Sequence, residues 1–135
     1  MIAIDPSALI AIFRQEPEAE PFLKTIVAAE RRCMSALGLL EMSMVMSGGA
    51  ADKEVCAPLD DFLAEASIEI VPFDAAQAKL AREAFLSFGK GRHKAALNLG
   101  DCASYALSKS RGVPLLFKGG DFIHTDLPAA SSGPS

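Results

Sequence analysis

The chain begins with MIAIDPSALI, residues 1–10, in which a short apolar run stops at a carboxylate that a proline follows. Ile2 and Ile4 are β-branched, which favours a buried strand, and Pro6 biases Asp5 toward an extended conformation. The sequence therefore predicts a first strand that ends at Asp5. That residue is explained equally well as a functional group at the strand's carboxyl end or as a cap for the next helix.

Short apolar strands and helical patterns continue to alternate over the rest of the chain. Further strands are expected at residues 33–35, 68–72 and 113–117. Helices are expected at residues 8–13, 18–30, 36–47, 51–66 and 101–109. A further helix is expected after its cap Asp74, running through Phe85 and ending near Gly89. Such alternation is typical of a parallel sheet with helices on both faces, where sites form at the carboxyl ends of strands. We therefore predict an α/β fold with four to five parallel strands, in which Asp5 and Asp121 lie near each other.

Length and composition indicate one domain. Half of the 135 residues are apolar, which suffices for one core but not for two. We expect a single domain at residues 1–128 and a flexible tail at 129–135, where small residues, Gly and Pro gather. The three cysteines are widely separated, so neither a disulfide framework nor a zinc site is predicted, and a cytoplasmic location is expected. No signal peptide or membrane-spanning stretch is predicted.

The net charge of −4 is unevenly divided along the chain. The first 70 residues carry 5 basic and 12 acidic side chains, whereas the rest carry 8 and 5. The basic second half includes Lys90, Arg92 and Lys94 in one predicted loop and Lys118 after the last predicted strand. These four side chains are candidate contacts for nucleic-acid phosphates, with ordinary solvated positions as the equal alternative.

Glu41 is the only charged residue between Arg32 and Asp52, and it lies in a predicted helix built of apolar and small residues. Burying an unpaired carboxylate there would cost on the order of several kcal/mol, so a buried Glu41 requires a partner. A solvated stripe on the helix is the alternative, because Glu is a good helix former.

Two more carboxylates stand at the ends of predicted elements. Asp101 opens a helix and Asp121 follows the last strand, so each alone is explained as a cap or a turn residue. Together with Asp5 and Glu41, however, they would form a cluster of carboxylates that repel one another. Mg²⁺ takes oxygen ligands and can activate a water against a phosphodiester, so the cluster predicts magnesium chemistry.

Four stretches resemble, in order and spacing, the VapC toxins of the PIN-domain family. They are IDPSAL (4–9), SALGLLE (35–41), LNLGDCASYAL (97–107) and PLLFKGGDF (114–122), the last followed by Thr125 and Asp126. The resemblance covers nearly the whole chain. It implies a three-layer α/β/α PIN fold, cleavage of RNA that depends on Mg²⁺ or Mn²⁺, and neutralisation by a VapB antitoxin in a type II toxin–antitoxin pair.

The resemblance also implies roles for individual residues. The metal-binding and catalytic acids would be Asp5, Glu41, Asp101 and Asp121. Ser7 would support the first of them as a hydrogen-bond donor.

The chain departs from the family pattern at two positions. Pro6 stands where Thr is common, which removes a hydroxyl, and Gly120 stands where Asp or Asn is common. The second departure lies beside Asp121, and Asp126 is the available substitute ligand.

The main hypothesis is therefore a Mg²⁺-dependent endoribonuclease that acts as a toxin and holds RNA with the basic side chains named above. The rival is a PIN-like domain, weakened at Pro6 and Gly120, that binds protein or RNA without cleaving it. A phosphorylated receiver domain is a poorer option, because no central Asp-bearing strand is predicted. The apolar patterns at 8–13 and 36–46 predict either a homodimer or antitoxin contact, or else two central core helices.

Overall fold

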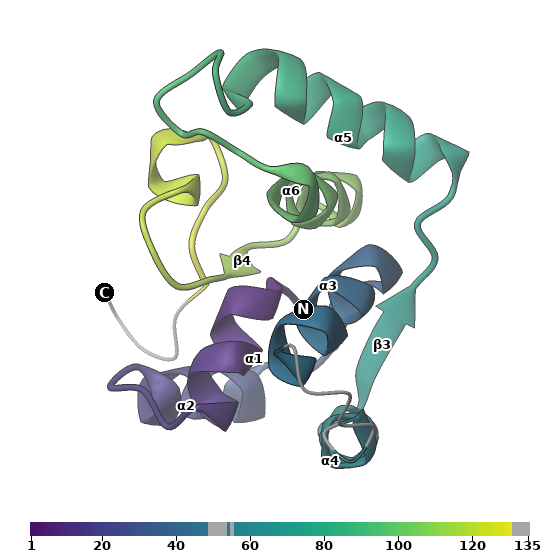
Figure 1. Cartoon of the computed structure of the whole chain (residues 1–135), viewed down its shortest axis with the longest axis vertical. Helices are drawn as coiled ribbons and strands as arrows, with labels where there is room; N and C mark the ends of the chain where they lie inside the picture. The colour runs from purple at the N-terminus through teal and green to yellow at the C-terminus, as the bar shows by residue number, and fades with distance from the viewer. Residues whose placement is uncertain (49–53, 55, 131–135) are drawn as a thin grey trace.

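The computed structural model describes residues 1–48, 54 and 56–130 (Figure 1). Its strands are β1 (Ile2–Ile4), β2 (Arg32–Ser35), β3 (Ile68–Val71) and β4 (Leu115–Leu116). Its helices are α1 (Pro6–Phe13), α2 (Ala19–Ala28), α3 (Ala36–Ser47), α4 (Cys56–Glu65), α5 (Ala75–Phe88), α6 (Leu99–Arg111) and the short 3₁₀ helix η2 (Phe122–His124). No helix among the described residues is long and apolar enough to cross a membrane.

The four strands form one parallel sheet in the order β3-β2-β1-β4. The chain moves outward from β1 to β2 and β3, then crosses back to place β4 on the other side of β1. The carboxyl ends of β1 and β4 therefore flank the point where the direction of winding reverses, which is where open α/β sheets form their ligand crevice. The amide of Asp5 donates to the carbonyl of Leu116 at 2.9 Å, so the two strand ends meet there.

Helices cover both faces of the sheet, which confirms the predicted three-layer architecture. Because side chains alternate along a strand, Ile2 and Ile4 of β1 face one layer while Ala3 faces the other. The first layer contains α1 to α4, and the second contains α5 and α6, as Figure 1 shows.

The helix ends are set by local hydrogen bonds. Ser35 caps α3 and Asp74 caps α5 through their side-chain oxygens. Asn98 and Asp101 form a reciprocal capping box at the start of α6, and Gly112, with φ of +62°, ends that helix in the left-handed region. Helices α3, α5 and α6 therefore begin at residues whose side chains replace the missing backbone partners.

Arg32 lies in β2, not at the end of a helix as its position after α2 would suggest. Its guanidinium still serves that helix end, because it donates to the carbonyls of Ile26, Val27 and Ala29. It also donates to the carbonyl of Ala66 at 3.0 Å, just after α4. One strand residue thus joins the carboxyl ends of two helices.

Several predicted boundaries differ from the structure. β4 is two residues long, not five, and α6 begins at Leu99, not at Asp101. The predicted tail began at residue 129, but Ala129 forms a parallel bridge with Leu115, and the amide of Ala130 donates to the Leu115 carbonyl at 2.9 Å. Residues 129–130 thus extend the sheet beside β4, while residues 131–135 and the predicted helix start at 51 lie outside the described residues.

Candidate functional site

Asp5 lies at the carboxyl end of β1 and caps α1, so the two interpretations of this residue are compatible. Its side chain is 3% exposed. Oδ2 accepts from the backbone amide of Ser7 at 3.0 Å, and Oδ1 accepts from the hydroxyl of Ser104 at 2.6 Å. Burial raises the pKa of Asp5, although the hydrogen bonds from Ser104 and Ser7 lower it in part.

Asp101 occupies the first turn of α6 and is 8% exposed. Its Oδ2 accepts from the amide of Asn98 at 3.0 Å, which leaves Oδ1 for other partners. Burial raises the pKa of Asp101 to about 7, and the negative charges of Asp5 and Asp121 act in the same direction. A helix cap that was only structural would not need acidic neighbours.

Glu41 is half-buried on α3 and rests against the first turn of α6. Gly100 is buried, and a Cβ atom added there would overlap the carboxylate oxygens and Cδ of Glu41. Glycine at position 100 therefore provides the space in which this carboxylate lies. Burial raises the pKa of Glu41, and the charge of Asp5 raises it further, so the helix face that carries Glu41 belongs to the same acidic pocket.

Asp121 lies just before η2 and is exposed at the edge of the pocket. Its negative charge raises the pKa values of Asp5 and Asp101. The predicted proximity of Asp5 and Asp121 is therefore confirmed. Four carboxylates, from the end of β1, from α3, from α6 and from the segment after β4, contribute to one site. Burial raises the pKa values of Asp5, Glu41 and Asp101, and the charged groups that shift them further are acidic.

Two serines hold the pocket, of which sequence reasoning found one. Ser7 was predicted to donate to Asp5, and it does so through its backbone amide, while its hydroxyl accepts from the amide of Lys118 at 3.0 Å. Ser104 was missed. Its spacing of three residues from Asp101 on a helix places both side chains on one face, and this was the available signal.

Asp126 lies apart from the site, so its predicted role as a substitute ligand has no support in the described contacts. Its Oδ1 accepts from the hydroxyl of Tyr105 at 2.6 Å, and its Oδ2 pairs with the ammonium of Lys109 at 2.5 Å. Both oxygens are therefore engaged by donors on α6.

The predicted phosphate contacts fall into two groups. Lys90 and Lys94 are exposed in the loop before α6, and Arg92 lies over the ring of Phe85, 5.7 Å from its centroid. Lys118 is instead paired with two carboxylates, at 3.0 Å from Glu16 and 3.4 Å from Glu18. Surface pairs of this kind are weak, so Lys118 remains exchangeable toward a phosphate.

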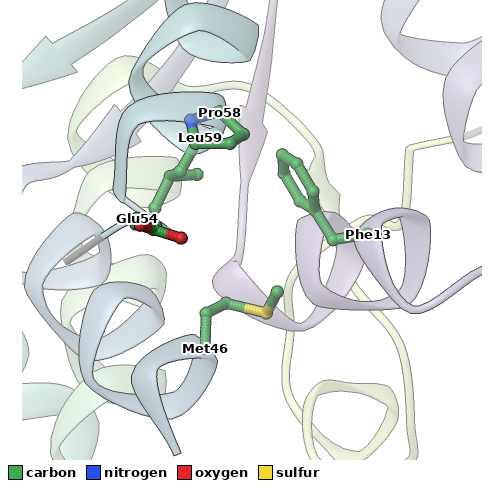
Figure 2. Close-up of a pocket in the computed structure, with 5 residues that line it drawn as sticks. All are labelled: Phe13, Met46, Glu54, Pro58 and Leu59. Atoms are coloured by element: carbon green, nitrogen blue, oxygen red, sulfur yellow. The ribbon is translucent and has the colours of Figure 1, made fainter. Parts of the chain in front are cut away.

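Two apolar cavities lie near these elements. Phe13 of α1 and Met46 of α3 line a cavity of about 300 Å³ together with Glu54, Pro58 and Leu59, as Figure 2 shows. A second cavity of about 270 Å³ adjoins the acidic site, since Glu41 and Gly100 line it together with apolar side chains. Those side chains are Leu37, Leu40, Met44, Val45 and Leu99.

The carboxylates of the candidate site are ligands of the kind that magnesium prefers. Within residues 1–48, 54 and 56–130, no three acidic, histidine or cysteine side chains converge into a ready-made metal cage. Mg²⁺ does not require one, because proteins usually hold it by one or two carboxylates, with waters and substrate phosphates completing the shell. Buried carboxylates such as Asp5 and Asp101, with raised pKa values and acidic neighbours, are donors of the required kind.

Comparison with known proteins gives consistent matches over nearly the whole chain. A model of the PIN domain matches residues 2–127. Ribonuclease VapC30 of Mycobacterium tuberculosis is 45% identical over 129 residues, which cover 93% of this chain and 95% of that protein. Ribonuclease VapC of Mycolicibacterium smegmatis is 45% identical over 131 residues, covering 95% and 98% of the two chains.

Solved structures share the fold at much lower identity. The M. tuberculosis toxin VapC20, described as cleaving the sarcin-ricin loop, superposes with a TM-score of 0.77 at 15% identity over 97% of this chain and 99% of its own. VapBC2 from Rickettsia felis, solved with a promoter DNA fragment, gives a TM-score of 0.73 at 16% identity over 96% of each chain.

Proposed function

The chain belongs to the PIN-domain family and, within it, to the VapC ribonucleases, and on this premise we propose that it is a magnesium-dependent endoribonuclease. We further propose that it acts as the toxin of a toxin–antitoxin pair. The observation that carries the proposal is that Asp5 interacts electrostatically with both Glu41 and Asp101, which are far from it in the sequence. Burial raises the pKa values of all three, and the negative charges of neighbouring acids raise them further.

A cation relieves the repulsion among these carboxylates, and this is the physical reason to place a metal there. Asp5 and Asp101 would be its main ligands, with Glu41 and Asp121 beside them. Bound there, Mg²⁺ would activate a water and neutralise charge on the phosphate oxygens of RNA.

The protein's own part in the reaction is to hold its acids still. Ser7 and Ser104 occupy one lone pair on each oxygen of Asp5, and the capping box fixes Asp101 to the backbone of Asn98. Glu41 is confined by the surface of Gly100. Preorganised acids of this kind need no rearrangement when the substrate arrives. Lys90, Arg92, Lys94 and Lys118 would contact RNA phosphates, which gives affinity without choice of base.

The partners follow from the relatives and from the apolar surface. Several solved neighbours are toxin–antitoxin complexes, and we propose a VapB-like antitoxin whose apolar segment fills the cavity of Phe13, Met46 and Leu59. Leu40, Met44 and Leu99 are 55%, 67% and 73% exposed, and we propose that a second copy of the chain covers them in a homodimer. The three cysteines are free, which agrees with a cytoplasmic location.

The test is cleavage of total cellular RNA by the purified chain in Mg²⁺ or Mn²⁺ and in EDTA, after removal of any co-purified antitoxin. Asp5→Asn is the active-site variant. Asp60→Asn, an exposed carboxylate on α4, is the matched control. Discrete fragments that require metal, persist in the control and disappear in Asp5→Asn are the expected result. A folded protein that binds an antitoxin but cleaves no RNA would favour the binding-module alternative.

A further inference from the structure

Ser104 connects the helix that carries one acid to the side chain of another. It lies on α6, one turn after Asp101, and only 2% of it is exposed. Its hydroxyl donates to Oδ1 of Asp5 at 2.6 Å, across 99 positions of sequence. The second carboxylate oxygen of Asp5 accepts from the amide of Ser7 at 3.0 Å. Both oxygens of the most buried acid in the site are therefore held by donors.

The next serine along the helix provides an internal comparison. Ser108 is 1% exposed, and its hydroxyl donates at 2.5 Å to the backbone carbonyl of Val113 beyond the end of α6. Ser104 and Ser108 are thus serines on the same helix that are buried to nearly the same extent. They differ in acceptor, since Ser108 ties down backbone whereas Ser104 holds a carboxylate of the site.

We propose that Ser104 is a positioning residue that fixes the rotation of the Asp5 carboxylate and thereby the lone pairs left for the metal. This inference rests on the proposed function, because it assigns Asp5 to metal binding. The hydroxyl contacts Oδ1 from the sheet-facing side of α6, so Asp5 cannot turn about its terminal torsion without breaking that bond. The terminal torsion of an Asp side chain is otherwise broad and poorly restrained.

The arrangement also couples two ligands through one helix. Asp101 and Ser104 project from the same face of α6, so the distance between Asp101 and Asp5 is set by α6 itself. Outer partners that orient metal ligands in this way are worth about 10- to 100-fold in metal affinity or activity when removed.

The experiment compares full-length wild type with Ser104→Ala, Ser104→Cys, Ser104→Thr and Ser108→Ala. Mn²⁺ alone is the probe, titrated at fixed pH and followed by the electron paramagnetic resonance signal of the free ion. Cleavage kinetics on one RNA separate kcat from KM, and thermal unfolding in EDTA reports on folding. Ser104→Cys keeps the volume of the side chain but offers only a weak donor, and Ser104→Thr keeps the hydroxyl.

We expect Ser104→Ala and Ser104→Cys to weaken Mn²⁺ binding about 10-fold and to lower kcat about 10- to 100-fold, with KM for RNA nearly unchanged. Ser104→Thr should recover most of both quantities. Ser108→Ala should lower the unfolding temperature without changing Mn²⁺ affinity.

Wild-type affinity in a folded Ser104→Ala or Ser104→Cys protein would overturn this inference alone. An equal loss of Mn²⁺ affinity in Ser108→Ala would also overturn it, because the effect would then be one of helix stability. Absence of Mn²⁺ binding by the wild type would overturn the metal proposal and this inference together.

Discussion

Helix α6 contacts two groups of acids, and their electrostatics are opposite. At its beginning, burial raises the pKa of Asp101 to about 7, and the negative charges of Asp5 and Asp121 contribute to this rise. Toward its other end, Asp126 meets Lys109 and Tyr105. Burial raises the pKa of Asp126, but the hydrogen bonds from these two donors and the charge of Lys109 together outweigh it, so the pKa is lowered overall.

The difference distinguishes an acid with a structural role from acids with a functional role, although both contact the same helix. Asp126 pairs with the ammonium of Lys109 as well as with the hydroxyl of Tyr105, so its charge is balanced and it stabilises the fold. Acids that have mainly one another as charged neighbours keep an unfavourable free energy in the folded state, which a cation can relieve. The two groups therefore should respond in opposite ways to the same amide substitution.

The largest contrast is expected in cleavage. Asp101→Asn should reduce RNA cleavage by more than about 100-fold, because it removes a charged ligand while keeping the oxygen that caps α6. Asp126→Asn should cleave at the wild-type rate. Initial rates on one RNA at saturating Mg²⁺ measure both variants. Equal losses in the two variants would erase the distinction between the groups.

A substitution at Gly100, against which the Glu41 carboxylate lies, should give the next largest effect on cleavage. In Gly100→Ala the new Cβ displaces the Glu41 carboxylate, so cleavage should fall about 10-fold or more. The unfolding free energy should stay within about 1 kcal/mol of wild type, since Ala is a better helix former than Gly. A double-mutant cycle with Glu41→Gln should be strongly non-additive. Additive losses would mean that Gly100 acts through something other than Glu41.

The pH dependence of stability should distinguish the groups in the absence of metal. The pKa of Asp101 is about 7 in the folded chain and about 4 in an unfolded one, so the folded state binds the additional proton. Its stabilising contribution is complete below pH 4 and is lost as pH rises through 7. In EDTA at pH 8, Asp101→Asn should therefore melt roughly 5 °C above wild type, and the gap should narrow toward pH 5.

Thermal unfolding from pH 5 to 8 measures this difference. Mg²⁺ should raise the wild-type melting temperature more at pH 8 than at pH 5, because protonated carboxyls bind metal poorly. Parallel curves for the two proteins would show that Asp101 is not strained in the metal-free state.

The smallest effect is expected at the satisfied acid. Asp126→Asn weakens the pair with Lys109 while keeping an acceptor for Tyr105, so the unfolding free energy should fall by about 0.5 to 1 kcal/mol. Urea unfolding at pH 7 measures this loss. An increase in stability would place Asp126 with the strained acids after all.

Much of the fold was predictable because its signals are local. Helix α3 begins after Ser35 and ends before Gly48, as its cap and stop residues predict. The strand ending at Asp5 followed from β-branched residues and the proline after them. The two residues paired beside β4 were not predictable, because Ala129 and Ala130 have weak strand propensity and are held by the backbone of Leu115.

The site was predictable in its acids and less so in what holds them. Glu41 stood out as a single charge in an apolar helix, and the resemblance to VapC toxins indicated the other acids. Ser104 and Gly100 act on residues that are far away in sequence, so no local pattern assigns their roles. Asp126 was predicted as a substitute ligand, but its oxygens contact Tyr105 and Lys109. Its proximity to Asp121 in the sequence does not reveal these contacts.

The close fit of Glu41 on Gly100 also limits how this protein can diverge. Alanine at position 100 would displace the carboxylate of Glu41. An aspartate at position 41, which is shorter by one methylene, would leave room for the added Cβ. Because each exchange alone changes the position of the carboxylate, the effects of the two substitutions are expected to be coupled. A library that varies the two positions jointly should therefore recover active combinations that single-site libraries miss.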